Sequence, residues 1–176
     1  MKLLRTLTIC TALIIFYGCS SDDSGGGSAE VFELAGNWRI LSYSYNGSKT
    51  VIDVENVIHS SFTGEGWEMD MNTQFSTNPN NFSTVGTYFV DHLVTDSEGN
   101  EQLYFGVFEI DDVGTWVRNN NDISFTIDDN TNQGYISILT DTQLELVINK
   151  YSSTTAPLTG VITNIVRTDT YLYTKE

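Results

Sequence analysis

The side chains that most often carry out catalysis are few in this sequence. Its 176 residues include two cysteines and two histidines, and the histidines, His59 and His92, lie in different segments. A serine nucleophile needs a base within reach and is often presented by a Gly-x-Ser-x-Gly turn, which the sequence lacks. We therefore interpret each histidine as a partly buried or surface residue and expect no catalytic site.

A metal site is the second kind of chemistry to weigh. Oxygen-bearing side chains fill Asp128-Asp129-Asn130-Thr131-Asn132-Gln133, as in a calcium-binding loop. The segment lacks a glycine at its sixth place, and Leu139 stands where the bidentate glutamate belongs. A hairpin turn uses the same residue types, so we interpret residues 128–134 as a turn. The neighbouring acids Asp111 and Asp112 could suggest a carboxylate pair for glycoside hydrolysis, but on a strand their side chains would point to opposite faces. We expect neither a metal nor another cofactor.

The sequence is strongly acidic, with 23 Asp and Glu against 8 Lys and Arg and a formal net charge of −15. Such a charge repels a phosphate backbone, and no cluster of basic residues in the sequence could release counterions from one. We therefore expect no nucleic-acid partner. The length allows one domain of ordinary size.

The first residues predict export from the cytoplasm. Lys2 and Arg5 give a short positive start, and residues 6–17 form an apolar run. This run is shorter than the roughly 20 residues that a membrane span requires. A polar segment of Ser, Asp and Gly follows over residues 20–28. The order is typical of a cleaved signal peptide and a flexible spacer.

The junction Phe16-Tyr17-Gly18-Cys19 resembles the lipobox of bacterial lipoproteins. The resemblance implies a signal peptide over residues 1–18, a diacylglycerol and a palmitate on Cys19, a flexible acidic tether over residues 19–29, and anchoring in the outer membrane of a Gram-negative cell. An ordinary signal peptide near a cysteine is the alternative. Ser-Ser-Asp-Asp after the cysteine is similar to export signals of surface lipoproteins and favours surface display over the periplasm, although a plain spacer has the same composition.

Apolar and polar residues alternate with a period of two from Glu30 onward, which predicts β-strands. The clearest case is residues 67–72, and similar strands are predicted over residues 38–45, 85–94, 103–110, 114–118, 123–127, 135–139, 144–148 and 165–173. One short helical turn is predicted over residues 29–34. Turns are predicted at Asn46-Gly47 and at residues 78–81, 96–100, 119–122 and 128–134. About eight to nine antiparallel strands without long crossovers leave an up-and-down barrel or a sandwich.

A family resemblance favours the barrel. Gly36-Asn37-Trp38, which opens the first predicted strand, matches the Gly-x-Trp signature of lipocalins. Gly114-Thr115-Trp116, Ile123-Ser124-Phe125 and residues 138–146 follow in the same order, before a tyrosine-rich last strand. Residues 30–176 therefore resemble the small lipocalin-like (calycin) domains of bacterial lipoproteins.

The resemblance also implies how one end of the barrel closes. In lipocalins the tryptophan covers one end and stacks on a basic residue of the last strand, a cation–π contact. Gly36, Trp38 and Arg167 are assigned to this barrel floor, and Lys175 is the other basic residue available. Arg167 shares a face of the last predicted strand with Asp169, so an ion pair between these two is expected as well.

A barrel interior has two groups of candidate lining residues. They are Trp67, Met69 and Met71, which alternation places on one face, and Tyr88, Val90 and His92, which mix apolar bodies with polar tips. Flexible thioethers and such mixed walls suit an adaptable ligand pocket, whereas a simple core stripe is the alternative for the first group.

Together these features predict a lipid-anchored, non-catalytic, lipocalin-like protein that binds a small apolar or amphipathic molecule outside the cytoplasm. We expect membrane contact through the lipid on Cys19 and a monomer. The alternative is a carbohydrate-binding or protein-interaction β-domain with a filled interior and exposed aromatic side chains, and an enzyme built on such a barrel is the third. A cavity of a few hundred Å³, open at the end opposite Trp38, would favour ligand binding.

Overall fold

The computed structural model describes Phe32–Glu176. The predicted signal peptide, Cys19 and the predicted tether lie outside these residues, as does the start of the helical turn predicted for residues 29–34. Residues 32–35 belong to neither a helix nor a strand, so that turn is not confirmed.

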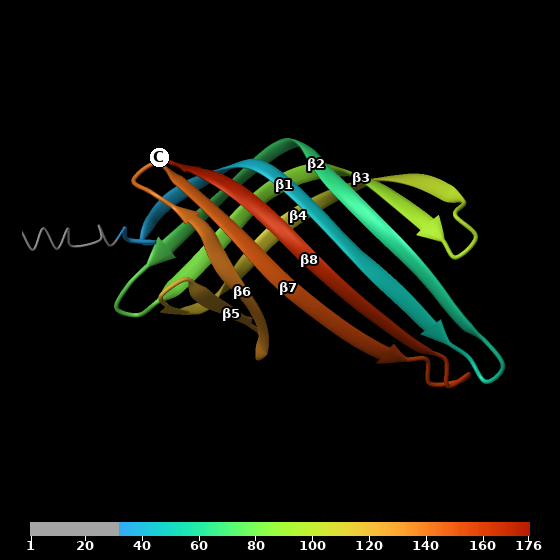
Figure 1. Cartoon of the computed structure of the whole chain (residues 1–176). Coiled ribbons are helices and arrows are strands. Elements are labelled where there is room, and N and C mark those ends of the chain that lie inside the picture. The colour runs from blue at the N-terminus through green and yellow to red at the C-terminus, as the bar shows by residue number, and fades with distance from the viewer. Residues whose placement is uncertain (1–31) are drawn as a thin grey trace, which may run out of the picture. The chain divides into compact units, whose positions relative to one another are not determined.

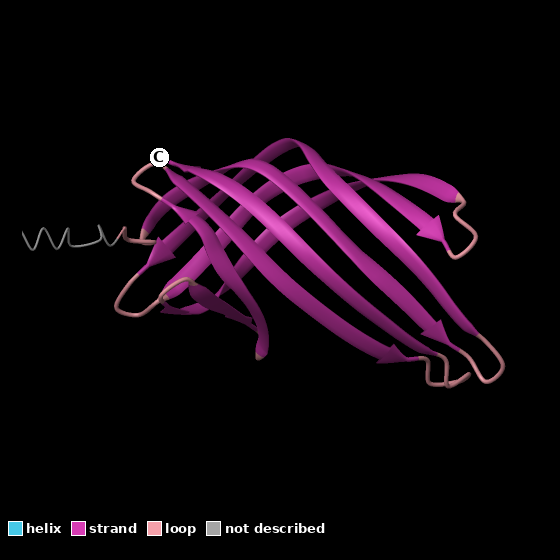
Figure 2. Cartoon of the chain, viewed as in Figure 1, coloured by secondary structure: helices cyan, strands magenta, loops and turns pink. Residues whose placement is uncertain are grey.

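The described residues form one sheet of eight antiparallel strands. The strands are β1 (Gly36–Ile52), β2 (Val57–Ser76), β3 (Asn81–Asp96), β4 (Glu101–Asn119), β5 (Asp122–Ile127), β6 (Asn130–Leu139), β7 (Gln143–Thr155) and β8 (Ile162–Lys175). Each strand pairs with the next, and β8 returns to β1, so the sheet closes into a ring (Figure 1). Strands and loops account for the whole described part (Figure 2). The predicted all-β, up-and-down topology is confirmed, and the ring replaces the sandwich alternative.

The first hairpin turns later than the sequence suggests. β1 continues through Asn46-Gly47, which we predicted to be a turn. Gly47 pairs with Phe62 on β2, and a Cβ atom at this position would collide with the Phe62 ring and with the carbonyl oxygen of Val166. The glycine therefore serves a close approach between strands. The chain turns instead at residues 53–56, where the Asp53 amide donates to the Asn56 carbonyl at 2.8 Å.

The hairpin between β5 and β6 confirms the turn predicted at its start. Asp128 and Asp129 have φ angles of 46° and 66° and form a two-residue connection. Two successive positive φ angles are typical of a type I′ turn, whose twist matches the flanking strands. Residues 130–134, which were included in the predicted turn, belong to β6.

The ring is complete at one end only. β4 pairs with β3 over residues 101–115, but its pairing with β5 covers only residues 115–119. On the other side, β7 pairs with β6 up to Asn149, while residues 150–155 pair with β8 alone. The far ends of β3 and β4 accordingly diverge from those of β7 and β8 (Figure 1). We call the end completed by β5 and β6 the closed end, and the other the open end.

Aromatic side chains fill the closed end. Phe75 lies 6.0 Å from Phe125 and 6.3 Å from Trp116 between ring centroids, and Phe82 meets Phe125 edge-on at 5.2 Å. The indole N–H of Trp116 reaches the carbonyl oxygen of Ser76 at 3.2 Å. Because its aromatic side chains interdigitate and this indole donor is paired, the closed end is a well-packed hydrophobic core.

Candidate ligand-binding site

The floor of the closed end is built around Trp38. Its side chain is fully buried, and its indole N–H donates to the carbonyl oxygen of Leu34 at 2.8 Å. The Lys175 ammonium lies 5.1 Å from the centre of the indole ring. Gly36 has a φ of 140°, and a Cβ there would lie 2.8 Å from Cε of Lys175. A glycine at this position therefore leaves room for the lysine to cover the tryptophan.

Arg167 does not belong to this floor, so its assignment as the partner of Trp38 is wrong. The register pairs Trp38 with Lys175, whereas Arg167 pairs with Gly47, far along the same two strands. The sequence offered both basic residues, and only the register between β1 and β8 separates them. The Arg167 guanidinium lies over the Tyr45 ring instead, 4.9 Å from its centre.

Arg167 takes part in a buried charge cluster in the ring interior. The Asp169 side chain is 0% exposed and lies 2.7 Å from Nε of Arg167, which confirms the ion pair predicted on the last strand. The ammonium of Lys150, on β7, is also 2.7 Å from the Asp169 carboxylate. The Tyr171 hydroxyl donates to the same carboxylate at 3.2 Å. One carboxylate thus faces two cations, which leaves one positive charge in excess.

Neutral tyrosines surround this cluster. Burial raises the pKa of four side chains around it above the ordinary tyrosine value, namely those of Tyr43, Tyr45, Tyr88 and Tyr171. Tyr43 stacks on Tyr171 with ring centroids 4.8 Å apart and meets Tyr88 edge-on at 5.2 Å. These phenols therefore stay protonated at neutral pH, where they supply hydroxyl groups without adding charge.

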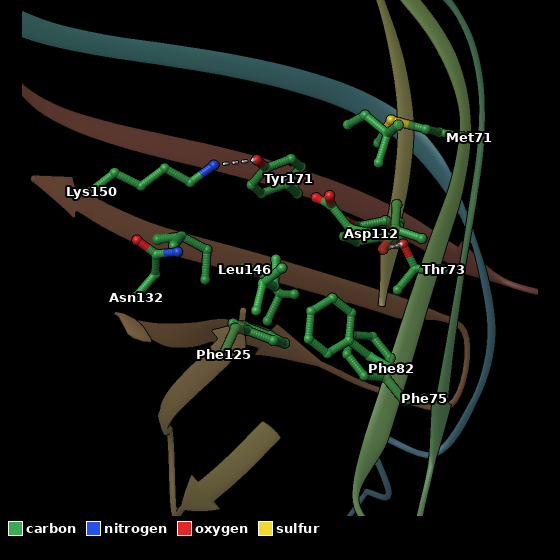
Figure 3. A pocket seen from close by; sticks show the side chains of 15 residues that line it. Met71, Thr73, Phe75, Phe82, Asp112, Phe125, Asn132, Leu146, Lys150 and Tyr171 are labelled. Carbon is green, nitrogen blue, oxygen red and sulfur yellow. Dashed lines mark hydrogen bonds between the residues drawn. The ribbon is translucent and has the colours of Figure 1, made fainter. Parts of the chain in front are cut away.

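A small inner cavity of about 90 Å³ lies between the charge cluster and the aromatic core. Figure 3 shows the side chains around it, including Met71, Thr73, Phe125 and Lys150. Lys150 points to the Tyr171 hydroxyl, 3.4 Å away, at one edge of the space (Figure 3). The wall is thus mostly apolar, and its polar members are Thr73, Thr84, Asp112 and Asn132 besides Lys150 and the tyrosines.

A much larger outer cavity of about 800 Å³ occupies the open end. Its wall carries the aromatic side chains of Tyr45, Phe62, His92, Tyr104 and Tyr151 and the cationic side chains of Lys49, Lys150 and Arg167. Asn132 and Lys150 line both cavities, so the two spaces adjoin. The combination offers apolar surface and positive charge to one molecule.

His92 links two of these walls. His92 is on β3 and Tyr45 on β1, with β2 between them. Nδ1 of His92 lies 2.7 Å from the Tyr45 hydroxyl. Burial, and then the positive charge of Arg167, lower the pKa of His92 below its ordinary value. The imidazole is therefore mainly neutral at pH 7 and holds the Tyr45 phenol by a hydrogen bond.

The structure brings together only some of the residues predicted to contact a ligand. Met71 lines the inner cavity and His92 the outer one. Val90 and Tyr88 are buried, and Tyr88 stacks on Phe108 at 5.3 Å between centroids. Met69 is partly buried against the core. These last three support the walls of the site but line neither cavity.

Trp67 lies on the outer face of the ring, so its predicted place beside Met69 and Met71 is wrong. A β-bulge interrupts the pairing of β2 with β3 between Trp67 and Asp70, and Glu68 has a φ of 45° there. The extra residue moves Trp67 to the face opposite Met71. Its ring is 40% exposed, stacks on Phe89 at 4.6 Å and donates its N–H to Asp91 at 2.8 Å.

Two cationic residues of the site, Lys49 and Lys150, were not found from the sequence. Lys49 lies four residues beyond Tyr45 on β1, past the pair Asn46-Gly47. Because that pair has the composition of a turn, the predicted strand ends at Tyr45, before the lysine. Lys150 lies two residues beyond the predicted strand 144–148, so continuing its alternation would have placed this lysine on the inner face.

Comparison with protein-family models, with curated proteins and with solved structures found no match to this chain. Among residues 32–176, no three His, Cys, Asp or Glu side chains are grouped so that they could hold a metal ion. The same residues include no helix with the length and apolar character that crossing a membrane demands.

Proposed function

We propose that this protein is a lipid-anchored, lipocalin-like binding protein of the bacterial outer membrane that takes a small apolar or amphipathic molecule into its ring without catalysing a reaction. The observation that carries this proposal is the outer cavity of about 800 Å³ at the end of the ring away from Trp38. Cavities of this volume accommodate small-molecule ligands, and a mixture of aromatic and polar wall residues is common in such sites.

The closed end supports the same function. Because Trp38, Phe125 and their neighbours fill that end, the larger space for a ligand lies at the open end. The inner cavity extends the space toward the aromatic core and offers an apolar wall at Met71 and Phe82. A ligand with an apolar body therefore gains from burying part of it in this direction.

A second candidate function is carbohydrate or protein binding on the outer face. It rests on one observation, the pair of Trp67 and Phe89, whose rings stack with an interplanar angle of 27° on the exterior. Exposed aromatic faces of this kind are suited to contacts with sugars or with another protein. Replacing Trp67 with alanine would abolish such binding and leave an interior ligand in place.

The first experiment tests whether the interior holds the ligand. Val94 lines the outer cavity, and Val85 lies 53% exposed on the same strand. Val94→Trp fills part of the cavity, whereas Val85→Trp adds the same bulk outside it. Native mass spectrometry of protein purified from its own host should show a bound small molecule with the wild type and Val85→Trp, and about tenfold less with Val94→Trp. An empty wild-type chain, or equal occupancy in both variants, would contradict interior binding.

The second experiment tests the anchor. Replacing Cys19 with serine removes the thiol that lipidation requires, so the protein should move from the membrane fraction to the soluble fraction. Cys10→Ser, which leaves Cys19 in place, is the control and should stay with the membrane. Membrane retention of the Cys19→Ser variant would overturn the lipoprotein assignment without affecting the proposal for the cavity.

A further inference from the structure

Positive charge is concentrated in the outer cavity. The cavity is lined by 13 of the 145 described residues, yet these include Lys49, Lys150 and Arg167, three of the six Lys and Arg side chains in the described part. None of the Asp and Glu residues among the described 145 lines it. In a chain with a net charge of −15, the cavity is therefore a local region of the opposite sign.

The ion pairs inside the ring do not use up this charge. Asp169 is the carboxylate that pairs with both Lys150 and Arg167, each at 2.7 Å. Lys49 forms no ion pair with any residue of the described part. The three cations and one carboxylate leave two positive charges that a ligand could neutralise. Lys150 and Arg167 are partly buried, and partly desolvated charges attract a counter-charge more strongly than charges on an open surface do.

Arg167 is held in a position to bind an anion. Its Nε lies 2.7 Å from one oxygen of Asp169 and its Nη2 donates to the other at 3.0 Å, so one edge of the guanidinium is fixed. The ring of Tyr45 supports its flat face. Nη1 makes no hydrogen bond to another described residue, and the side chain is 31% exposed. The free edge therefore offers oriented donors to a ligand oxygen, the arrangement that carboxylates bind best.

We infer that the outer cavity binds an organic anion, with its acidic group at Arg167, Lys150 and Lys49 and its apolar body against the aromatic wall. This inference rests on the proposed function and names the ligand class for the same cavity. The acidic group neutralises the excess charge, while Phe62 and Tyr104 supply apolar contact. A neutral molecule of equal size would leave the positive charges uncompensated.

A matched pair of fluorescent probes tests the charge requirement. Anilinonaphthalene sulfonate is an organic anion, and phenylnaphthylamine has the same aromatic body without the sulfonate. Both are titrated into the full chain carrying Cys19→Ser, so that no attached lipid competes. We expect the sulfonate to bind at least about tenfold more tightly than the neutral probe. A higher salt concentration should weaken the binding of the sulfonate and leave that of the neutral probe unchanged.

Substitutions locate the charge that matters. Lys49→Gln removes a cation that no described carboxylate pairs with and should weaken sulfonate binding about two- to fivefold. The double variant Arg167→Gln/Asp169→Asn leaves the excess of two positive charges unchanged but removes the guanidinium donors of Arg167, and should weaken sulfonate binding through the loss of those hydrogen bonds. Arg39→Gln is the control, because it removes the same charge at the closed end, where Arg39 pairs with Glu176. The affinity for phenylnaphthylamine should be unchanged in all three variants.

The outcomes separate this inference from the proposed function. Binding of both probes with equal affinity, unaffected by Lys49→Gln and by the double variant, would overturn the anion site and leave the ligand-binding ring intact. Binding of neither probe would count against both. If the anion site holds, competition with dodecanoate and with cholate distinguishes a linear fatty acid from a rigid polycyclic acid as the preferred body.

Discussion

At the closed end of the ring, all eight strands are paired and aromatic side chains fill the interior, whereas at the open end β4 and β7 lack a partner on one side and the interior is a cavity. The same long strands β1, β2, β3, β4, β7 and β8 pass through both ends. The closed end buries Trp38 and Leu144 completely, while the open end leaves Lys49 and Tyr104 in contact with solvent. What separates the two ends is the length of β5 and β6.

This difference divides stability and binding between the two ends. Where β5 and β6 complete the ring, opposing walls are close enough for Phe75 and Phe125 to touch, and burial of apolar surface stabilises the fold. Beyond these two short strands, β4 and β7 each lack a pairing partner on one side, and the outer cavity lies between side chains of the two strands. The side chains that line this cavity are therefore the ones available for a ligand.

The largest expected effect tests whether stability resides in the closed end. Trp38→Ala removes a fully buried side chain and its hydrogen bond to Leu34, and should lower the free energy of unfolding by about 3–5 kcal/mol. Tyr104→Ala removes an aromatic ring that is 45% exposed in the cavity wall and should cost less than about 1 kcal/mol. Urea unfolding measures both. Equal losses would remove the distinction between the two ends.

An intermediate effect sharpens the comparison through the cations of β8. A double-mutant cycle of Trp38→Phe with Lys175→Gln should give a coupling energy of about 0.5–2 kcal/mol, since the ammonium lies over the indole ring. The cycle of Trp38→Phe with Arg167→Lys should be additive within about 0.5 kcal/mol, because Arg167 lies in the open half. Coupling of Trp38 to Arg167 would restore the floor that the sequence suggested.

The smallest expected effect concerns His92 in the open end. Its pKa is lowered in the folded state by burial and by Arg167, so the unfolded chain takes up the proton first as the pH falls. The stabilising contribution of neutral His92 is therefore present above about pH 6.5 and is lost as the pH falls through the lowered pKa. Urea unfolding between pH 7.5 and 5 should show a smaller loss of stability for His92→Gln than for the wild type. His59→Gln, at an exposed position, should behave like the wild type.

The sequence predicted several parts of the fold correctly because they depend on neighbouring residues alone. Every strand predicted from alternation lies within an observed strand. The Asp-rich segment after Ile127 forms the predicted turn, with the positive φ angles that a type I′ hairpin needs. The ion pair of Arg167 with Asp169 also followed from alternation, since residues two apart on a strand share a face.

The errors arose where a local exception breaks the alternation. The bulge at Glu68 moves Trp67 to the outer face. One extra residue in a strand reverses the face to which every side chain before it points. Asn46-Gly47 has the composition of a turn, but Gly47 is required by the approach of Phe62 and Val166 from the neighbouring strands. Neither exception can be recognised without the partner strands.

The amino-acid sequence by itself determined an acidic chain of antiparallel strands with a tryptophan at the start of the first one, since composition, alternation and turn residues act over a few positions. Only the tertiary structure decided that the strands close into a ring, that Lys175 rather than Arg167 covers Trp38, and that Lys49, Lys150 and Arg167 meet in one cavity. These last contacts join β1 to β7 and β8 across more than half of the chain. Their positions depend on the register between strands, which the pairing of the whole sheet sets.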